Sequence, residues 1–421
     1  MKTSLRQLAR KIFDLGSGEV LARLCSVATL LFLAHKFGVV FVGIYALAQG
    51  LVQYSYPFID FGLRHVGVRL LAKYPQAGQE IVHQVQRRRL MMAGALLPLL
   101  ALYAASVKMP LQSKLFLFSF TAVGSLYAVS LDWAAWGKEH FRLAGFGKAV
   151  SPISVLAAVL LGRNSDHVLW WLVAGNLIGN VLQATIFTRW WRAHLPEKEQ
   201  DISLDLIRDS LAWRRTSVMG LAWFCNMAFA SIDMLMLGLM SDPRQVGLYS
   251  AAYRVINQVL YTYYFLTVAL YPQLARQSQT QRVRMLRPKI LVSLVGLGIV
   301  IAALVTLGRR PVVTILFGNE FLPATLLLVL LAWAVPLDFL TSYLSNAYIA
   351  WGMEKKTLVC TVIAAASNIL LNLIWIPRFG AKAAAVNTLI SYVIFLASLA
   401  VAGHSARELA PDAERVPELI T

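Results

Sequence analysis

Long apolar runs separated by short polar connectors make up almost the whole chain. A membrane-spanning helix needs about 20 largely apolar residues, and twelve runs come close to that length. The runs cover residues 16–36, 39–61, 90–107, 113–136, 146–162, 167–188, 213–239, 246–273, 289–307, 323–350, 357–376 and 381–403. The pattern therefore predicts an all-α integral membrane protein with about 12 transmembrane helices.

The longest polar stretch follows the sixth run and divides the chain. We expect an N-terminal six-helix lobe at 1–194, a cytoplasmic connector at 195–212, a C-terminal six-helix lobe at 213–404 and a cytoplasmic tail at 405–421. Residues 202–207 within the connector could form a short helix on the membrane surface.

The two halves resemble each other at positions six helices apart. Residues 42–48 (VGIYALA) match 246–252 (VGLYSAA), and residues 135–139 (AWGKE) match 350–354 (AWGME). Two matches in corresponding places indicate duplication, and six helices per half make the repeats parallel. Parallel repeats of this kind enclose a central cavity and work by alternating access, which predicts a transporter.

Composition excludes a water-soluble protein. Of 421 residues, 58% are hydrophobic and 14% are charged, and the mean hydropathy is +0.62, whereas soluble domains carry about 25% charged residues. The net charge of +18 would suit nucleic acid, but the positive residues fall in short clusters between apolar runs, so no nucleic-acid partner is expected. The three cysteines, Cys25, Cys225 and Cys360, all lie in apolar runs and indicate neither a disulfide framework nor a metal site.

The charge distribution predicts the orientation in the membrane. Connectors on one side, with the two termini, hold 28 of the 39 lysines and arginines, and the positive-inside rule places that side in the cytoplasm. Both termini are therefore expected there. Clusters such as Arg87, Arg88 and Arg89 are expected to anchor their helices and to meet anionic membrane lipids.

Short motifs resemble a known family. The motifs are residues 231–233 (SID), 246–254 (VGLYSAAYR), 59–63 (IDFGL) and 377–384 (PRFGAKAA). They are similar to the polysaccharide and O-antigen flippases of the MOP exporter superfamily, and the similarity extends to helix count and chain length.

The resemblance implies a function and a location. It implies a flippase in the bacterial inner membrane that translocates an undecaprenyl-pyrophosphate-linked oligosaccharide from the cytoplasmic to the periplasmic leaflet during surface polysaccharide biosynthesis. Expected partners are that glycan lipid, membrane lipids, and candidate polymerase and glycosyltransferase proteins. No cofactor, metal or catalytic residue is expected, and coupling to H⁺ or Na⁺ is left open.

Arg23 and Arg254 are the strongest candidates for substrate binding. An arginine at the centre of a membrane helix costs about 2.5–3.5 kcal/mol on insertion scales and usually faces a cavity or a partner. A guanidinium offers paired donors to a pyrophosphate. The alternative for Arg23 is a salt bridge with Glu19, four residues earlier.

The polar residues of the second and eighth helices complete the predicted substrate site. The resemblance to lipid II flippases implies cavity arginines in helices 1, 2 and 8, but the second helix here offers Gln49 and Gln53 instead. Tyr253 lies in a tyrosine-rich eighth helix, where the rings either stack on sugars or pack the core.

Asp233 is the candidate for ion coupling, because it matches an acidic position of the family within an otherwise apolar helix. Its carboxylate could titrate or coordinate Na⁺, or it could fix neighbouring helices by hydrogen bonds. The pairs Asn176 and Asn180, and Asn368 and Asn372, each share one helix face, and we expect both to pack helices together.

Two other functions compete with a flippase. A related MATE-like multidrug antiporter would need an acidic cavity for cationic drugs, whereas the deep residues here are basic. A membrane-embedded glycosyltransferase or ligase would need a large outer loop with acidic residues, and the outer acids Asp166, Asp242 and Glu320 are isolated. The sequence therefore favours a transporter over an enzyme.

Overall fold

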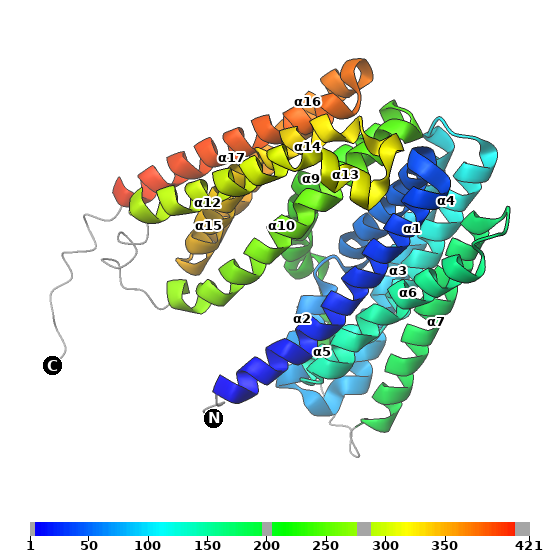
Figure 1. The fold of residues 1–421 in the computed structure, drawn as a ribbon. Helices are drawn as coiled ribbons and strands as arrows, with labels where there is room; N and C mark the ends of the chain where they lie inside the picture. The colour runs from blue at the N-terminus through cyan, green and yellow to red at the C-terminus, as the bar shows by residue number, and fades with distance from the viewer. Residues whose placement is uncertain (1–4, 196–203, 276–287, 409–421) are drawn as a thin grey trace. The chain divides into compact units, whose positions relative to one another are not determined.

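The computed structural model describes residues 5–195, 204–275 and 288–408. Every regular element in these ranges is a helix (Figure 1), which confirms the all-α class. Internal contacts divide the chain into two compact units, residues 1–224 and 225–421. The predicted lobe boundary at 195–212 stays a prediction.

The first unit is built from seven complete α-helices, a short eighth helix and the beginning of a ninth. They are α1 (Leu5–Asp60), α2 (Leu63–Lys73), α3 (Gly78–Ser106), α4 (Leu111–Gly124), α5 (Asp132–Gly137), α6 (Phe141–Leu161), α7 (Val168–Ala193), α8 (Leu204–Ser210) and the start of α9 (Trp213–Met240), with 3₁₀ turns at Pro75–Ala77 and Ser125–Val129.

Helix α1 is long enough for two membrane crossings. Its apolar part, Gly16–Asp60, has 45 residues, which at 1.5 Å per residue span about 68 Å, more than twice the hydrocarbon thickness of a bilayer. Gly38 interrupts the helix with φ 76° and ψ −171°, a conformation open essentially to glycine alone. The break falls in the gap between the predicted runs 16–36 and 39–61.

Helical structure extends beyond the apolar runs. Helix α3 begins at Gly78, whereas its apolar run begins at residue 90, because a helix continues into the polar zone outside the hydrocarbon. Helix α2 lies between two apolar runs and was not predicted. The fourth predicted helix is divided, since α4 passes into a 3₁₀ turn before α5 begins at Asp132.

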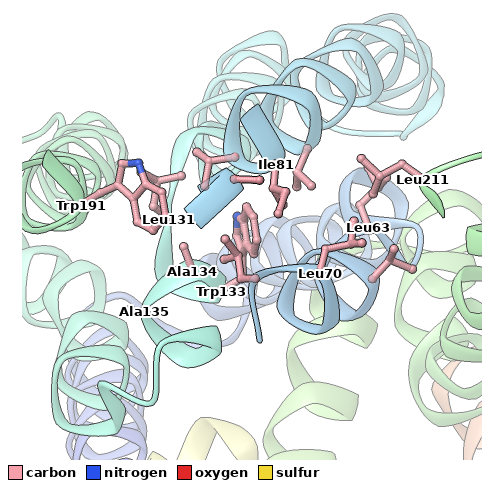
Figure 2. Close-up of a cluster of buried hydrophobic side chains, with 14 of the residues drawn as sticks. Leu63, Leu70, Ile81, Leu131, Trp133, Ala134, Ala135, Trp191 and Leu211 are labelled. Atoms are coloured by element: carbon pink, nitrogen blue, oxygen red, sulfur yellow. The ribbon is translucent and has the colours of Figure 1, made fainter. Parts of the chain in front are cut away.

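An apolar core joins the short helices at one end of the first unit. Trp133 is fully buried at its centre, surrounded by side chains of α2, α3, α5 and the residue after α8 (Figure 2). Gly67 allows this contact, because a Cβ atom there would lie 2.6 Å from the Trp133 ring. Ile207 and Leu211 also enter the core, so the short helix α8 is held by its apolar residues.

The second unit contains the remainder of α9 and a second set of helices. They are α10 (Pro243–Ala275), α12 (Pro288–Leu307), α13 (Arg309–Phe317), α14 (Ala324–Ala332), α15 (Val335–Ala350), α16 (Glu354–Phe379) and α17 (Ala381–Glu408), with a 3₁₀ turn at Asn319–Phe321. The predicted helix 323–350 is interrupted between α14 and α15, next to Pro336, which cannot donate a backbone hydrogen bond.

Ten helical stretches of the described residues are long and apolar enough to cross a membrane. One of them is the double-length α1, and α10 has 33 residues and could add a further crossing. The structure is thus consistent with twelve crossings. Apolar side chains remain exposed along these helices, including Leu161 on α6, Leu304 on α12 and Leu370 on α16. Such exposure is expected of a multi-pass membrane protein whose outer surface meets lipid.

Candidate substrate and ion sites

Arg23 lies within a three-residue charge cluster on α1 and α6. Its Nη2 atom donates to Glu19 Oε1 over 2.9 Å, and Lys148 Nζ donates to Glu19 Oε2 over 3.2 Å. The ion pair with Glu19 is the one that the sequence offered as the alternative for Arg23. Each carboxylate oxygen therefore receives one cation, and Lys148 is a member that the sequence analysis did not single out.

A contact between two glycines brings the cluster together. A Cβ atom on Gly18 would lie 2.1 Å from the backbone carbon of Gly145, so only glycine allows α1 and α6 to approach this closely. Glu19 follows Gly18, and Lys148 lies three residues after Gly145, one helical turn along the same face. The close approach thus sets the distance between Glu19 and Lys148.

The two glutamines after the kink of α1 differ in environment. Gln49 is half-buried and donates its Nε2 to Tyr45 Oη over 2.6 Å. Gln53, one turn later, is exposed. Both belong to the first unit, and their contact with substrate stays a prediction.

Tyr253 and Arg254 lie on α10 in the second unit. The Tyr253 hydroxyl donates to the Ala230 carbonyl over 2.7 Å, and its ring stacks on Tyr249 with centroids 6.0 Å apart. These contacts match the packing alternative for the tyrosine. Arg254 is half-buried. Because Arg23 and Arg254 belong to different units, the prediction that both face one cavity stays a prediction.

Asp233 accepts hydrogen bonds from three helices of the second unit. Its Oδ2 accepts from Tyr249 Oη over 2.7 Å and from Thr388 Oγ1 over 2.8 Å, and its Oδ1 accepts from Asn372 Nδ2. The residue is only 2% exposed. A carboxylate that receives three donors in a buried site is well satisfied and holds α9, α10, α16 and α17 together.

Asparagines extend this network. Asn372 Nδ2 also approaches Asn368 Oδ1, and Asn387 Nδ2 donates to Asn372 Oδ1 over 2.9 Å. The Oδ1 atom of Asn387 is buried and accepts no hydrogen bond within the described part of the chain. A buried acceptor of this kind is normally satisfied by a donor, a water or a cation, and Asn372 connects Asn387 to the Asp233 carboxylate.

The first unit has a comparable asparagine pair without an acid. Asn176 Nδ2 donates to the Phe120 carbonyl over 3.0 Å, Asn180 Nδ2 donates to Asn176 Oδ1 over 2.8 Å, and Ser151 joins the same oxygen. This set contains only neutral groups and joins α4, α6 and α7. Of the two asparagine pairs, only Asn368 and Asn372 contact a group that can change charge.

A second set of charges is enclosed where α1 ends. Arg89 Nε lies 3.0 Å from Asp60 Oδ1, and Arg64 Nη1 lies 3.2 Å from Asp132 Oδ2. The Tyr127 hydroxyl donates to Asp60 Oδ2 over 3.2 Å and links the two pairs. Two cations meet two carboxylates, so the set is neutral and its role is structural.

Arg89 corrects one expectation from the sequence. Its side chain is fully buried and also donates to the Ser130 carbonyl over 2.7 Å, so it cannot meet anionic lipid. Arg88 donates to the Leu211 carbonyl, whereas Arg87 is exposed. Three adjacent arginines point in three directions around a helix, and hydropathy alone does not distinguish them.

Sequence reasoning missed Lys148, Tyr249, Asn387 and Thr388. Lys148 lies at the start of an apolar run and was counted with the connector before it. Tyr249 lies in the repeated stretch 246–252, and this repeat could have identified it as a candidate site residue. Nothing in the local sequence distinguishes Asn387 or Thr388. Thr388 contacts Asp233, which lies 155 residues earlier in the chain, and Asn387 contacts Asn372 on the preceding helix.

Comparisons with known proteins test the resemblance to the polysaccharide and O-antigen flippases. Residues 146–278 match the family model described as polysaccharide biosynthesis protein. A protein of Escherichia coli (strain K12) with the printed name "Putative O-antigen transporter" is 23% identical over 368 residues, which cover 83% of this chain and 84% of that protein. The resemblance to polysaccharide and O-antigen flippases is thereby confirmed.

Two transporters are among the solved structures that align with almost the whole chain. The lipid II flippase MurJ in an inward closed conformation aligns with a TM-score of 0.65 and 14% identity, over 93% of this chain and 87% of that chain. An inward-facing multidrug resistance MATE family transporter of the MOP superfamily aligns with a TM-score of 0.64 and 11% identity, over 94% of this chain and 95% of that chain. At these identities the similarity shows the fold alone, which is that of MOP superfamily transporters.

Proposed function

We propose that this chain is a flippase that moves a polyprenyl-pyrophosphate-linked oligosaccharide across the bacterial inner membrane by alternating access. The similarity to the Escherichia coli protein over most of both chains supports a lipid-linked glycan as substrate, and the MurJ-like fold supports translocation of a lipid. The proposed place of the activity is surface polysaccharide biosynthesis, with both termini in the cytoplasm.

An anionic substrate is favoured by the exposure of the charged side chains within the membrane helices. Arg23 and Lys148 keep 28% and 39% of their side chains exposed, and Glu19 between them keeps 30%. Asp60, Asp132 and Asp233 are buried and bonded to partners. Asp338 is half-buried and accepts a hydrogen bond from Tyr392. The accessible charge is therefore more basic than acidic, which suits a pyrophosphate better than the cationic drugs of a multidrug antiporter.

Arg23 and Arg254 are the proposed receptors of the pyrophosphate. A guanidinium forms two parallel hydrogen bonds with phosphate oxygens, and a lysine at the same position keeps the charge but loses that geometry. Replacement by alanine should stop translocation, and replacement by lysine should leave part of it. Gln49 and Gln53 would supply neutral donors to the same ligand, and Tyr253 would face its sugars.

Asp233 is the proposed site of ion coupling. Oxygen atoms of Asp233, Thr388 and Asn387 suit a proton or a hard cation such as Na⁺, and the unsatisfied Oδ1 of Asn387 fits this use. Binding of the ion would alter the hydrogen bonds that join α9, α10, α16 and α17, and so could bias the conformation of the second unit. The described residues contain no group of three or more His, Cys, Asp or Glu side chains that could hold a metal ion.

An enzyme remains the less favoured proposal. In the described ranges, the buried acids are engaged in hydrogen bonds or ion pairs within membrane helices, and the proposed function includes no bond cleavage.

The test of the substrate class uses cells that lack this protein. The proposal predicts that they accumulate the glycan lipid on the cytoplasmic leaflet and that they take up and expel ethidium as normal cells do. Unchanged glycan export together with increased ethidium retention would instead establish a multidrug antiporter.

A further inference from the structure

Lys148 belongs to the charge cluster of Arg23 and Glu19, and the proposal above gives neither Lys148 nor Glu19 a role in binding. Lys148 lies seven residues after the start of α6 at Phe141, and Arg23 lies seven residues after Gly16, where the apolar part of α1 begins. At 1.5 Å per residue, Lys148 is about 10 Å from the start of α6, and Arg23 is about 10 Å from the start of the apolar part of α1. Both cations contact the same carboxylate, that of Glu19.

The cluster differs from the enclosed charge set in exposure. The side chains of Arg23, Glu19 and Lys148 are 28%, 30% and 39% exposed, whereas Asp60 and Arg89 are 1% and 0% exposed. A charged group in a membrane helix avoids lipid and faces protein or a water-filled space. The open cluster therefore has room for a further polar ligand, and the enclosed set does not.

The cluster also differs in charge balance. Arg23 and Lys148 carry two positive charges, and Glu19 supplies one negative charge, so the three side chains hold one net positive charge. The enclosed set of two arginines and two aspartates is neutral. An open site with excess positive charge attracts an anion, and one that carries more charge than a carboxylate would compete with Glu19 for both cations.

We propose that Arg23 and Lys148 together bind a diphosphate and that Glu19 is the resident counter-ion that the diphosphate displaces. The inference rests on the proposed flippase function and adds Lys148 and Glu19 to its binding residues. The guanidinium supplies a planar pair of donors and the ammonium a compact charge. Two phosphoryl groups in sequence can occupy both, whereas a monophosphate offers one.

Glu19 gives the site a means of release. In the empty site the carboxylate pairs with both cations, which lowers the cost of holding them within the membrane. A ligand must therefore replace this interaction, and its affinity is reduced by the strength of the pairing with Glu19. A transport site must bind strongly enough to load and weakly enough to unload, and removal of Glu19 should shift that balance toward retention.

The experiment measures binding by the full-length protein in nanodiscs of neutral lipid. The probes are undecaprenyl diphosphate, undecaprenyl monophosphate and inorganic pyrophosphate, with dissociation constants from native mass spectrometry. Lys148→Gln and Arg23→Gln should each weaken undecaprenyl diphosphate binding by about tenfold or more, the effect of losing one hydrogen bond to a charged group. Glu19→Gln should tighten it, and Lys148→Arg should retain it.

Lys36→Gln is the matched control on the same helix. Lys36 is exposed near the other end of the first crossing and donates to Asn164 Oδ1 over 3.1 Å, so its replacement should leave binding unchanged. Inorganic pyrophosphate bound as tightly as the lipid would identify a free diphosphate as the ligand of the same site. Weaker binding of inorganic pyrophosphate would identify the lipid-linked form.

The proposal predicts that Glu19→Gln tightens the binding of undecaprenyl diphosphate and that Lys148→Gln weakens it. A salt bridge with a purely structural role would not produce opposite changes in affinity. If Glu19→Gln weakens binding as much as Lys148→Gln, the cluster only ties α1 to α6 and the inference is overturned. If the wild-type protein binds undecaprenyl diphosphate and Lys148→Gln binds it equally well, the inference is overturned and the proposed function is not. Wild-type protein that binds none of the three probes overturns the proposed function itself.

Discussion

At the scale of single residues, the structure separates charges that hold the protein together from charges that are open to a ligand. Asp60 and Arg89 lie among buried groups and form an ion pair with each other. Glu19, Arg23 and Lys148 are partly exposed. Replacing Arg89 of the buried set should therefore impair folding, whereas replacing Arg23 of the partly exposed set should impair substrate binding.

Arg89→Ala should destabilise the fold. Removing one partner of a buried ion pair typically costs about 3–5 kcal/mol, because it leaves an uncompensated charge. We expect a lower thermal unfolding midpoint in detergent, measured by the change in tryptophan fluorescence. Arg87→Ala, an exposed neighbour on the same helix, should leave the midpoint unchanged. Equal midpoints for both variants would show that Arg89 and Asp60 contribute nothing to stability.

Asp233→Asn should reduce transport without reducing the amount of protein in the membrane. Asparagine has nearly the same shape and can remain bonded to Tyr249 and Thr388, but it cannot take up a proton or offer a full negative charge to a cation. The measurement is glycan export in cells at matched protein abundance. Asp242→Asn is the control. Asp242 is exposed at the start of α10, where its Oδ1 accepts a hydrogen bond from the backbone N–H of Gln245. Normal export by Asp233→Asn would restrict Asp233 to helix packing.

At the scale of elements, close helix contacts position the polar groups. Gly18 and Gly145 bring α1 and α6 together, and Gly175 and Gly179 do the same for α7 against α6, where added Cβ atoms would lie within 3 Å of α6 atoms. Small residues allow this approach between membrane helices. The position of Lys148 next to Glu19 depends on it.

Gly18→Ala should lower both stability and transport, because its Cβ would overlap the Gly145 backbone and separate α1 from α6. Gly16→Ala is the matched control two residues earlier, where a Cβ would meet nothing within 4 Å. Alanine favours a helix over glycine by about 1 kcal/mol, so this control should be neutral or slightly stabilising. Thermal midpoints that move in the same direction would contradict the described contact between α1 and α6.

At the scale of the whole molecule, hydropathy predicted most helices and few of their ends. The ruler of about 20 apolar residues found both halves of α1 and most of the long helices after it, because lipid demands continuous apolar surface. It predicted no helix at α13, which lies between two predicted runs. It missed α2 and the first turns of α3, which are helical without being apolar throughout. Of the candidate site residues, Arg23 and Asp233 were visible as charges in apolar runs, whereas Thr388 and Lys148 gain meaning only from partners distant in the sequence.

The predicted orientation is tested by single cysteines in a background without Cys25, Cys225 and Cys360. A membrane-impermeant thiol reagent should label a cysteine at Asp242 from the periplasm. A cysteine at Arg284, which lies outside the described residues, should react only after the cytoplasmic side is opened. Labelling of both from the same side would contradict an orientation with both termini in the cytoplasm.

Whether the chain moves a lipid-linked glycan between leaflets is tested by measuring translocation with the purified protein in proteoliposomes. A fluorescent undecaprenyl-pyrophosphate-linked oligosaccharide would be placed in both leaflets, and the fraction exposed to an external quenching reagent would be followed over time. The account predicts that about half of the label is quenched at once in empty vesicles and in vesicles carrying Arg254→Ala, and that nearly all becomes quenched with wild-type protein. The experiment would be repeated with pH and Na⁺ gradients of both directions. If quenching with wild-type protein always stops at the level of empty vesicles, the protein does not translocate this lipid.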